Sequence, residues 1–166
     1  MKLIQEGAFI SEIFFHADIV SHAYERLKKS AVASDYIGVW SAIQSILIST
    51  SNISKILWPQ SKYAERGKEL RKLLKVDSNC VLKSRKFRNK FEHYDELISD
   101  FFEDKNIDSY TDFAMNPSLR SLGMESCHRG YNSYNNTIVI HGEILELDSI
   151  IDNAKEIKLK CKSLFI

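Results

Sequence analysis

The sequence predicts an all-α fold: a four- or five-helix up-and-down bundle with one small β-hairpin before the last helix. Apolar residues recur every three or four positions over most of the chain, which is the period of an amphipathic helix. Two short strand-like runs occur at about residues 137–147. A chain of 166 residues that is 44% hydrophobic can bury most of its apolar surface in one core. We therefore expect a single domain over residues 1–166.

The first two helices are expected at about residues 10–30 and 35–58. Apolar positions spaced three and four apart run through both segments. Asp35 is a suitable N-cap for the second helix because its carboxylate can accept a hydrogen bond from a free backbone N–H. Pro59 cannot continue a helix and ends it. The second helix is apolar over much of its circumference, so we expect it to be the most buried element.

A third helix is expected at about residues 62–74 and a fourth at about residues 82–104. In the third helix, leucines face inward and basic residues face outward. At about 100° per residue, the fourth helix carries one continuous apolar stripe toward the core. The stripe consists of Phe87, Phe91, Tyr94, Ile98 and Phe101. Asn89 and His93 lie four residues apart and are expected to point to the opposite side.

The region from about residue 105 to 136 has no helical period and contains several turn residues, so we expect an irregular connection. A connection of this length suggests a short helix near residues 118–124, or a functional or partner-binding role. The β-hairpin follows it.

The hairpin turn is expected at His141 and Gly142, because two residues between strand-like runs are typical of a tight turn. The last helix is then expected at about residues 148–164. Asp148 or Ser149 is its predicted cap.

Charge is distributed unevenly along a chain whose formal net charge is +1. A near-neutral total gives no global attraction to nucleic acid, so an anionic partner would need a local basic patch. Residues 61–90 form such a stretch, since only Glu65, Glu69 and Asp77 oppose their basic residues. Residues 92–108 are acidic in turn. The alternative is that both stretches are solvated helix faces.

The three cysteines, Cys80, Cys127 and Cys161, are widely spaced and form no C-x-x-C pair. This pattern indicates neither a disulfide framework nor a zinc cluster, and it is typical of a reducing compartment. The N-terminus lacks a secretory signal pattern. The most apolar stretch, residues 36–48, is too short to span a bilayer. We expect a cytoplasmic protein outside the membrane that uses no metal or cofactor.

Arg88 and His93 stand five residues apart in the predicted fourth helix, within the most basic part of the chain. Arginine is a permanent cation whose planar fork matches a phosphate, and histidine exchanges a proton near neutral pH. A cation that binds phosphate and a group that transfers protons are the least that a protein needs to cut RNA without a metal. The alternative is that both are solvated surface side chains, with Arg88 paired to Glu92 one turn on.

A resemblance to a known family rests on the run R-N-K-F-E-H-Y-D-E and on the long apolar helix before it, which ends S-N-I-S-K-I-L-W-P. These features resemble the HEPN superfamily of small prokaryotic helical proteins. That family carries an arginine, a polar residue and then a histidine four to six positions after the arginine, on a late helix of a four- or five-helix bundle. Arg88, Asn89 and His93 match these positions. The resemblance covers about residues 10–104 and the final helix.

The resemblance implies a metal-independent endoribonuclease, usually a homodimer that brings two copies of the motif into one cleft. It also implies a role in defence or in a toxin–antitoxin system, with an antitoxin or defence-complex protein as partner. RNA supplies its own nucleophile, the 2′-OH, and 2′,3′-cyclic phosphate ends would result. His93 would act as acid and base, and Arg88 as the phosphate clamp. Asn89 would hold the phosphate or the imidazole.

Four residues near the motif are weaker candidates for supporting or RNA-binding roles: Arg85, Lys86, Glu92 and Asp95. The two acidic ones either orient the motif or merely solvate the helix. In the irregular connection, three residues are lesser candidates for RNA contact through stacking or charge, although aromatic residues in loops also pack locally. They are His128, Tyr131 and Tyr134.

The chain departs from the family pattern beside the histidine. Some toxin members have a tyrosine two residues after it, which an antitoxin nucleotidyltransferase modifies. Here that position is Asp95, and the neighbouring Tyr94 lies on the predicted core stripe. Control by tyrosine nucleotidylation is therefore not expected. Two alternatives to the nuclease stay open: a non-catalytic module that binds RNA, a nucleotide or a partner protein, and a purely structural dimerisation domain.

Overall fold

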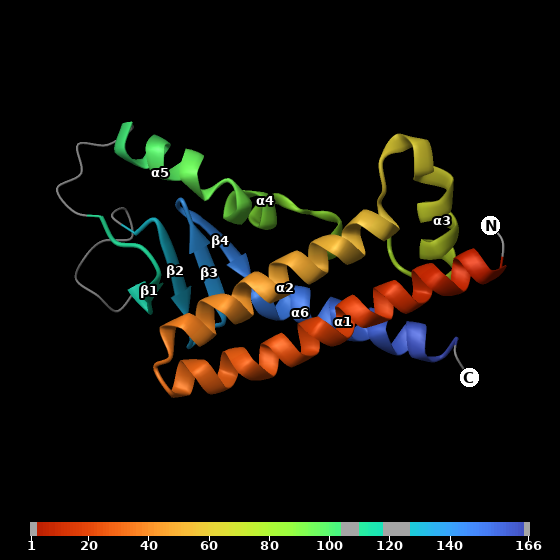
Figure 1. The fold of residues 1–166 in the computed structure, drawn as a ribbon, viewed down its shortest axis with the longest axis horizontal. Coiled ribbons are helices and arrows are strands. Elements are labelled where there is room, and N and C mark those ends of the chain that lie inside the picture. Colours follow the sequence, from red (N-terminus) through yellow and green to blue (C-terminus); the bar gives the residue numbers. More distant parts are fainter. Residues whose placement is uncertain (1–2, 104–109, 118–126, 165–166) are drawn as a thin grey trace.

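The centre of the fold is a layer of three long helices. A computed structural model describes residues 3–103, 110–117 and 127–164. α1 packs against both of the other long helices, and Figure 1 shows α1 and α2 side by side with α6 crossing them at an angle. The fold is mostly helical, as predicted, and carries a small four-stranded sheet. The three helices are α1 (Leu3–Val32), α2 (Tyr36–Leu57) and α6 (Leu147–Lys162).

Among the described helices, none is both long and apolar enough to cross a membrane.

The turn between α1 and α2 is built around Asp35. Its carboxylate accepts hydrogen bonds from the backbone N–H of Gly38 at 2.9 Å and from the Ser30 hydroxyl at 3.2 Å, so the predicted N-cap is confirmed. A Cβ at position 38 would collide with this carboxylate, which explains the glycine. α1 begins at Leu3 and not at the expected residue 10. Its first turn is helical although the side chains of Leu3 and Ile4 are exposed.

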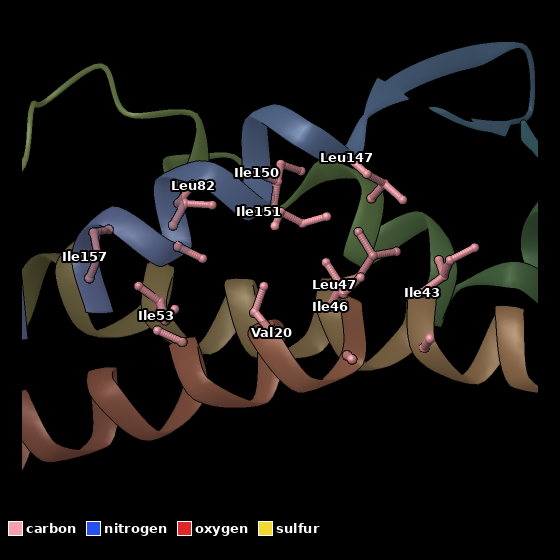
Figure 2. Close-up of a cluster of buried hydrophobic side chains, with 14 of the residues drawn as sticks. Val20, Ile43, Ile46, Leu47, Ile53, Leu82, Leu147, Ile150, Ile151 and Ile157 are labelled. Atoms are coloured by element: carbon pink, nitrogen blue, oxygen red, sulfur yellow. The ribbon is translucent and has the colours of Figure 1, made fainter. Parts of the chain in front are cut away.

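The hydrophobic core lies between the three long helices. α2 supplies more buried residues than α1 or α6, as its apolar circumference predicts. A short 3₁₀ turn, η2 (Val81–Lys83), adds Leu82 on the side of α6. Figure 2 shows side chains from these elements meeting in one cluster; those labelled are Val20, Ile43, Ile46, Leu47, Ile53, Leu82, Leu147, Ile150, Ile151 and Ile157.

The third helix, α3 (Ala64–Leu73), follows a 3₁₀ turn, η1 (Ser61–Tyr63), and matches the predicted segment. Leu70 is fully buried and Leu74 nearly so, as expected for the inward-facing leucines. Leu73 is only partly buried. Figure 1 shows α3 at the end of the molecule opposite to the sheet.

The prediction of one continuous helix over residues 82–104 is wrong, because the helix is interrupted at His93. α4 (Lys86–Glu92) ends there, and α5 (Tyr94–Glu103) begins at the next residue. The two helices have different packing partners. α4 packs against α2, whereas Phe101 of α5 packs edge-on against the ring of His128, with 5.6 Å between centroids. Tyr94, the first residue after the interruption, does not lie on a core stripe as predicted and is 49% exposed.

The sheet contains more than the predicted hairpin. β3 (Thr137–Ile140) and β4 (Glu143–Glu146) form that hairpin, and His141 and Gly142 both have positive φ, 50° and 75°. This confirms the predicted tight turn. β2 (Arg129–Asn132) pairs antiparallel with β3, and β1 (Ala114–Met115) pairs parallel with β2. β1 and β2 come from the region expected to be an irregular connection.

The cap predicted for the last helix is also wrong. α6 begins at Leu147, directly after β4, and the preceding Glu146 makes no capping hydrogen bond through its side chain. Asp148 instead accepts a hydrogen bond at 2.6 Å from the side-chain amide of Asn136. The carboxylate thereby ties the start of α6 to the turn before β3. The short helix expected near residues 118–124 lies outside the described residues.

Candidate functional site

The helix that carries the motif is fastened to the sheet by one acidic residue. The carboxylate of Glu143 on β4 forms ion pairs with two lysines of α4. Its oxygens lie 2.6 Å from Lys86 Nζ and 3.0 Å from Lys90 Nζ. These hydrogen bonds lower the pKa of Glu143. Lys86 was predicted as a supporting or RNA-binding residue; its ammonium group is paired with Glu143, and its contact with RNA stays a prediction. Glu143 thus fixes α4 relative to the sheet from one side.

Arg88 is held by acceptors of its own helix. Its Nη2 lies 2.5 Å from Glu92 Oε1, and its Nη1 donates to Asn89 Oδ1 at 3.1 Å. The side chain is 23% exposed. Its Nε is buried and has no hydrogen-bond partner. The structure therefore brings Arg88, Asn89 and Glu92 together, with the planar fork of the guanidinium oriented by a carboxylate and an amide oxygen.

His93 lies one turn further on, at the junction of α4 and α5. Its backbone N–H still donates to the carbonyl of Asn89 at 2.9 Å, which closes the last turn of α4. Its imidazole is 61% exposed, and Nδ1 lies 3.4 Å from Glu96 Oε1. Among the described hydrogen bonds and ion pairs, none joins His93 to the side chain of Arg88. Glu96 is a neighbour of the motif that the sequence pattern did not single out.

The remaining predicted residues lie around this site. Asp95 is exposed on the first turn of α5, and Arg85 precedes the first turn of α4. Arg85 and Arg88 both line a small cavity beneath α4.

The basic stretch does not form one patch, because α3 and α4 lie in different parts of the molecule (Figure 1). On α3, Arg66 stacks over the ring of Phe9, 4.5 Å from its centroid.

A second charged cluster, not expected from the sequence, lies beside Tyr94. Arg129 on β2 is only 5% exposed and forms a double ion pair with Asp112, with Nε 2.8 Å from Oδ1. Its guanidinium stacks against Phe113, with 4.1 Å to the ring centroid, and against Tyr94 at 5.4 Å. Burial raises the pKa of Asp112, but the hydrogen bond and charge of Arg129 outweigh burial and hold it below its usual value.

The structure contradicts two of the lesser RNA-contact predictions. His128 is fully buried, and neither ring nitrogen has a hydrogen-bond partner. Burial lowers its pKa, although Asp112 opposes the shift. Tyr131 is 4% exposed and donates its hydroxyl to Asn136 at 2.9 Å. Both residues serve the packing of the sheet. Tyr134 is 78% exposed, and its contact with RNA stays a prediction.

In the part of the chain that the structure describes, no group of three or more His, Cys, Asp or Glu side chains is placed so that it could hold a metal ion. None of Cys80, Cys127 and Cys161 is joined in a disulfide. The arrangement around Arg88 and His93 offers an oriented cation and an exposed imidazole, which are groups for phosphate binding and proton transfer.

Comparison with protein-family models, with curated proteins and with solved structures found no match to this chain.

Proposed function

We propose that this chain is a metal-independent endoribonuclease of HEPN type, acting in the cytoplasm in defence or as a toxin. The observation that carries the proposal is the junction at His93. There an exposed imidazole stands one helical turn from an oriented guanidinium. The order of arginine, polar residue and histidine on a late helix beside a helical core supports the same family and the HEPN fold.

The chemistry uses the 2′-OH of the RNA substrate. A neutral imidazole of His93 takes the 2′-OH proton while O2′ attacks phosphorus, and the P–O5′ bond then breaks. The leaving O5′ takes a proton from an imidazolium. Arg88 neutralises the charge that develops on the non-bridging oxygens, and Asn89 holds the phosphate beside it. The products are a 2′,3′-cyclic phosphate and a 5′-OH, and no metal is needed at any step.

Two proton transfers at opposite sides of the phosphorus require two groups. Each chain supplies one exposed histidine at this site, so we propose a homodimer in which His93 of each copy faces a shared cleft. In that arrangement one histidine acts as base and the other as acid. The resemblance also favours an antitoxin or defence-complex protein as a partner that controls the site.

The direct test incubates purified protein with end-labelled RNA in the presence of a chelator. We expect cleavage that leaves 2′,3′-cyclic phosphate ends, and none of a matched DNA. His93→Ala should lower the rate by about a hundredfold or more, since it removes both general acid and general base. His22→Ala is the matched control, because His22 is 83% exposed on α1, on another helix. No cleavage by the wild-type protein, or equal cleavage by His93→Ala, would refute the proposal.

A second candidate function is a non-catalytic module that binds RNA or a partner protein through the same face. One observation favours it: Glu92 and Asn89 already engage two of the donor atoms of Arg88. In that case the protein would retain RNA without turnover, and His93→Ala would leave retention unchanged. Filter binding and product analysis on the same samples separate the two functions.

A further inference from the structure

A small cavity lies beneath α4 where it meets α2, β4 and α6. Its volume is about 30 Å³. Arg85 and Arg88 line it from the side of α4, and Thr50 and Ser51 line it from α2. A water molecule needs about 10–15 Å³ of such space together with two to four polar partners. The cavity therefore has room for one or two waters.

Two buried polar atoms without partners belong to residues that line this cavity. They are the hydroxyl oxygen of Ser51 and the Nε of Arg88. A serine in a helix commonly donates to the carbonyl four residues earlier, as the neighbouring Thr50 does to Ile46 at 2.8 Å. Ser51 makes no such bond. Buried donors and acceptors are nearly always satisfied by protein or by ordered water, so both atoms call for a partner.

We propose that an ordered water in this cavity bridges Ser51 and Arg88, and that Ser51 is a positioning residue for the guanidinium. The Nε–H of Arg88 donates to the water oxygen, and the water donates one of its hydrogens to the Ser51 hydroxyl. With Nη1 on Asn89 and Nη2 on Glu92, all three nitrogens of the guanidinium then have a partner. The plane of the fork is thereby fixed from the core side as well as from the surface.

The water bridge is tested without any assay of activity. Solution NMR observes the Nε–Hε group of an arginine when its hydrogen exchanges slowly, and the Arg88 signal is identified by its loss in Arg88→Lys. We expect a slowly exchanging signal in the wild-type protein and exchange at least about tenfold faster in Ser51→Ala, because the hydrogen bond holds the hydrogen. Equal exchange in the two proteins would overturn the proposal.

Thr50→Val is the matched control. It changes the same wall of the cavity, but the Thr50 hydroxyl already bonds backbone carbonyls, so the Arg88 signal should not change. If Ser51→Ala does not fold, a high-resolution crystal structure of the wild-type protein decides the question. It should show an ordered water within hydrogen-bond distance of both Ser51 and Arg88. An empty cavity, or a water that contacts only one of them, would overturn the bridge.

The consequence for catalysis rests on the proposed ribonuclease activity. Ser51→Ala should then lower kcat by about tenfold with little change in KM, because the guanidinium is misaimed only for the transition state. The pH profile should keep its shape, since His93 is untouched. If the wild-type protein cuts no RNA, the proposed function fails, while the exchange measurement still decides on the water. An unchanged kcat with a lost bridge would overturn the positioning role alone.

Discussion

At the scale of single residues, the carboxylate of Glu92 competes with any phosphate for Arg88. The two side chains are 23% and 42% exposed and lie one helical turn apart. Ion pairs of this kind stabilise a helix only slightly, by about 0.3–0.5 kcal/mol. A phosphate that offers two oxygens to the guanidinium can therefore displace the carboxylate at small cost. In the proposed ribonuclease, Glu92 would orient the guanidinium of Arg88 when RNA is absent.

Glu92→Gln should consequently bind RNA more tightly than the wild-type protein. We expect an increase of about two- to fivefold, which corresponds to less than about 1 kcal/mol. Fluorescence anisotropy with a 2′-deoxy-substituted, uncleavable oligonucleotide measures it. Glu65→Gln on α3 is the control, because it changes the net charge equally and its exposed partner Lys68 lies away from the motif. Weaker binding would show that Glu92 is needed to orient Arg88, and unchanged binding would show that its carboxylate does not compete with the phosphate.

His128 is a second residue whose surroundings decide its behaviour. Its ring packs against Phe101 and Tyr110, with centroids at 5.6 and 5.9 Å, and His141, Asp112 and Arg129 lie near it. Burial holds the pKa of His128 below its ordinary value, so the imidazole stays neutral in the folded chain while the unfolded chain takes up a proton. Between the pKa of His128 in the folded chain and its higher pKa in the unfolded chain, the unfolded state binds more protons. The stability of the fold therefore falls as the pH falls through this range.

The free energy of unfolding should therefore fall as the pH drops below about 6.5, by at most about 1.4 kcal/mol per pH unit from this residue. His128→Phe should remove this part of the dependence, because a phenyl ring fits the aromatic surroundings and carries no proton. Urea denaturation between pH 5 and pH 8 measures it, with His22→Ala as control. A pH dependence identical to that of the wild-type protein would contradict the assignment.

At the scale of elements, the ion pair of Asp112 and Arg129 joins the segment before β1 to β2. The side chains are 14% and 6% exposed, so neither charge has bulk water to solvate it. Removing one partner of a buried ion pair leaves the other uncompensated, at a cost of about 3–5 kcal/mol. The pair also braces the face on which Tyr94 and Phe113 lie.

Arg129→Met should accordingly destabilise the protein by about 3–5 kcal/mol in chemical denaturation. The double variant with Asp112→Asn should be less destabilised than the sum of the single variants, because the orphaned charge is gone. Lys155→Met, which breaks an exposed pair with Asp152, should cost less than about 1 kcal/mol. A small effect of Arg129→Met would mean that water reaches Asp112.

Another property of the elements is the break between α4 and α5. The helix period continues through residues 82–104, and no proline or glycine interrupts it. The break arises because α4 packs on α2, while Phe101 of α5 packs among Tyr110 and His128. His93 lies at the junction and is 61% exposed there, on the side away from the core that the helix spacing predicts.

At the scale of the whole molecule, the proposed mechanism needs two copies of the chain. When wild-type and His93→Ala chains are unfolded together and refolded as mixtures, mixed dimers carry a single histidine. RNA cleavage should then fall as the square of the wild-type fraction. A linear fall would show that each chain acts alone. Sedimentation analysis of the same mixtures checks that the dimer forms.

The sequence by itself determined the features that depend on neighbours along the chain. The helical period located α1, α2, α3 and α6, because an amphipathic face repeats every three or four residues. Asp35 was recognisable as a cap and the pair at 141–142 as a turn, since both depend on local hydrogen bonds and backbone angles. The pair of Arg88 and Glu92 follows from helix spacing, because the two residues lie one turn apart.

Only the tertiary structure decided the features made by distant parts of the chain. The pairing of Asp112 with Arg129, the burial of His128 and the cavity between Ser51 and Arg88 join segments that no local pattern relates. The two short strands form by pairing across distant parts of the chain: β2 pairs with the edge of β3, and β1 pairs in turn with β2. The interruption of the helix at His93 likewise is not visible in the local sequence pattern. Spacing along the sequence could nominate the motif residues, but their contacts depend on which surfaces the rest of the chain brings against them.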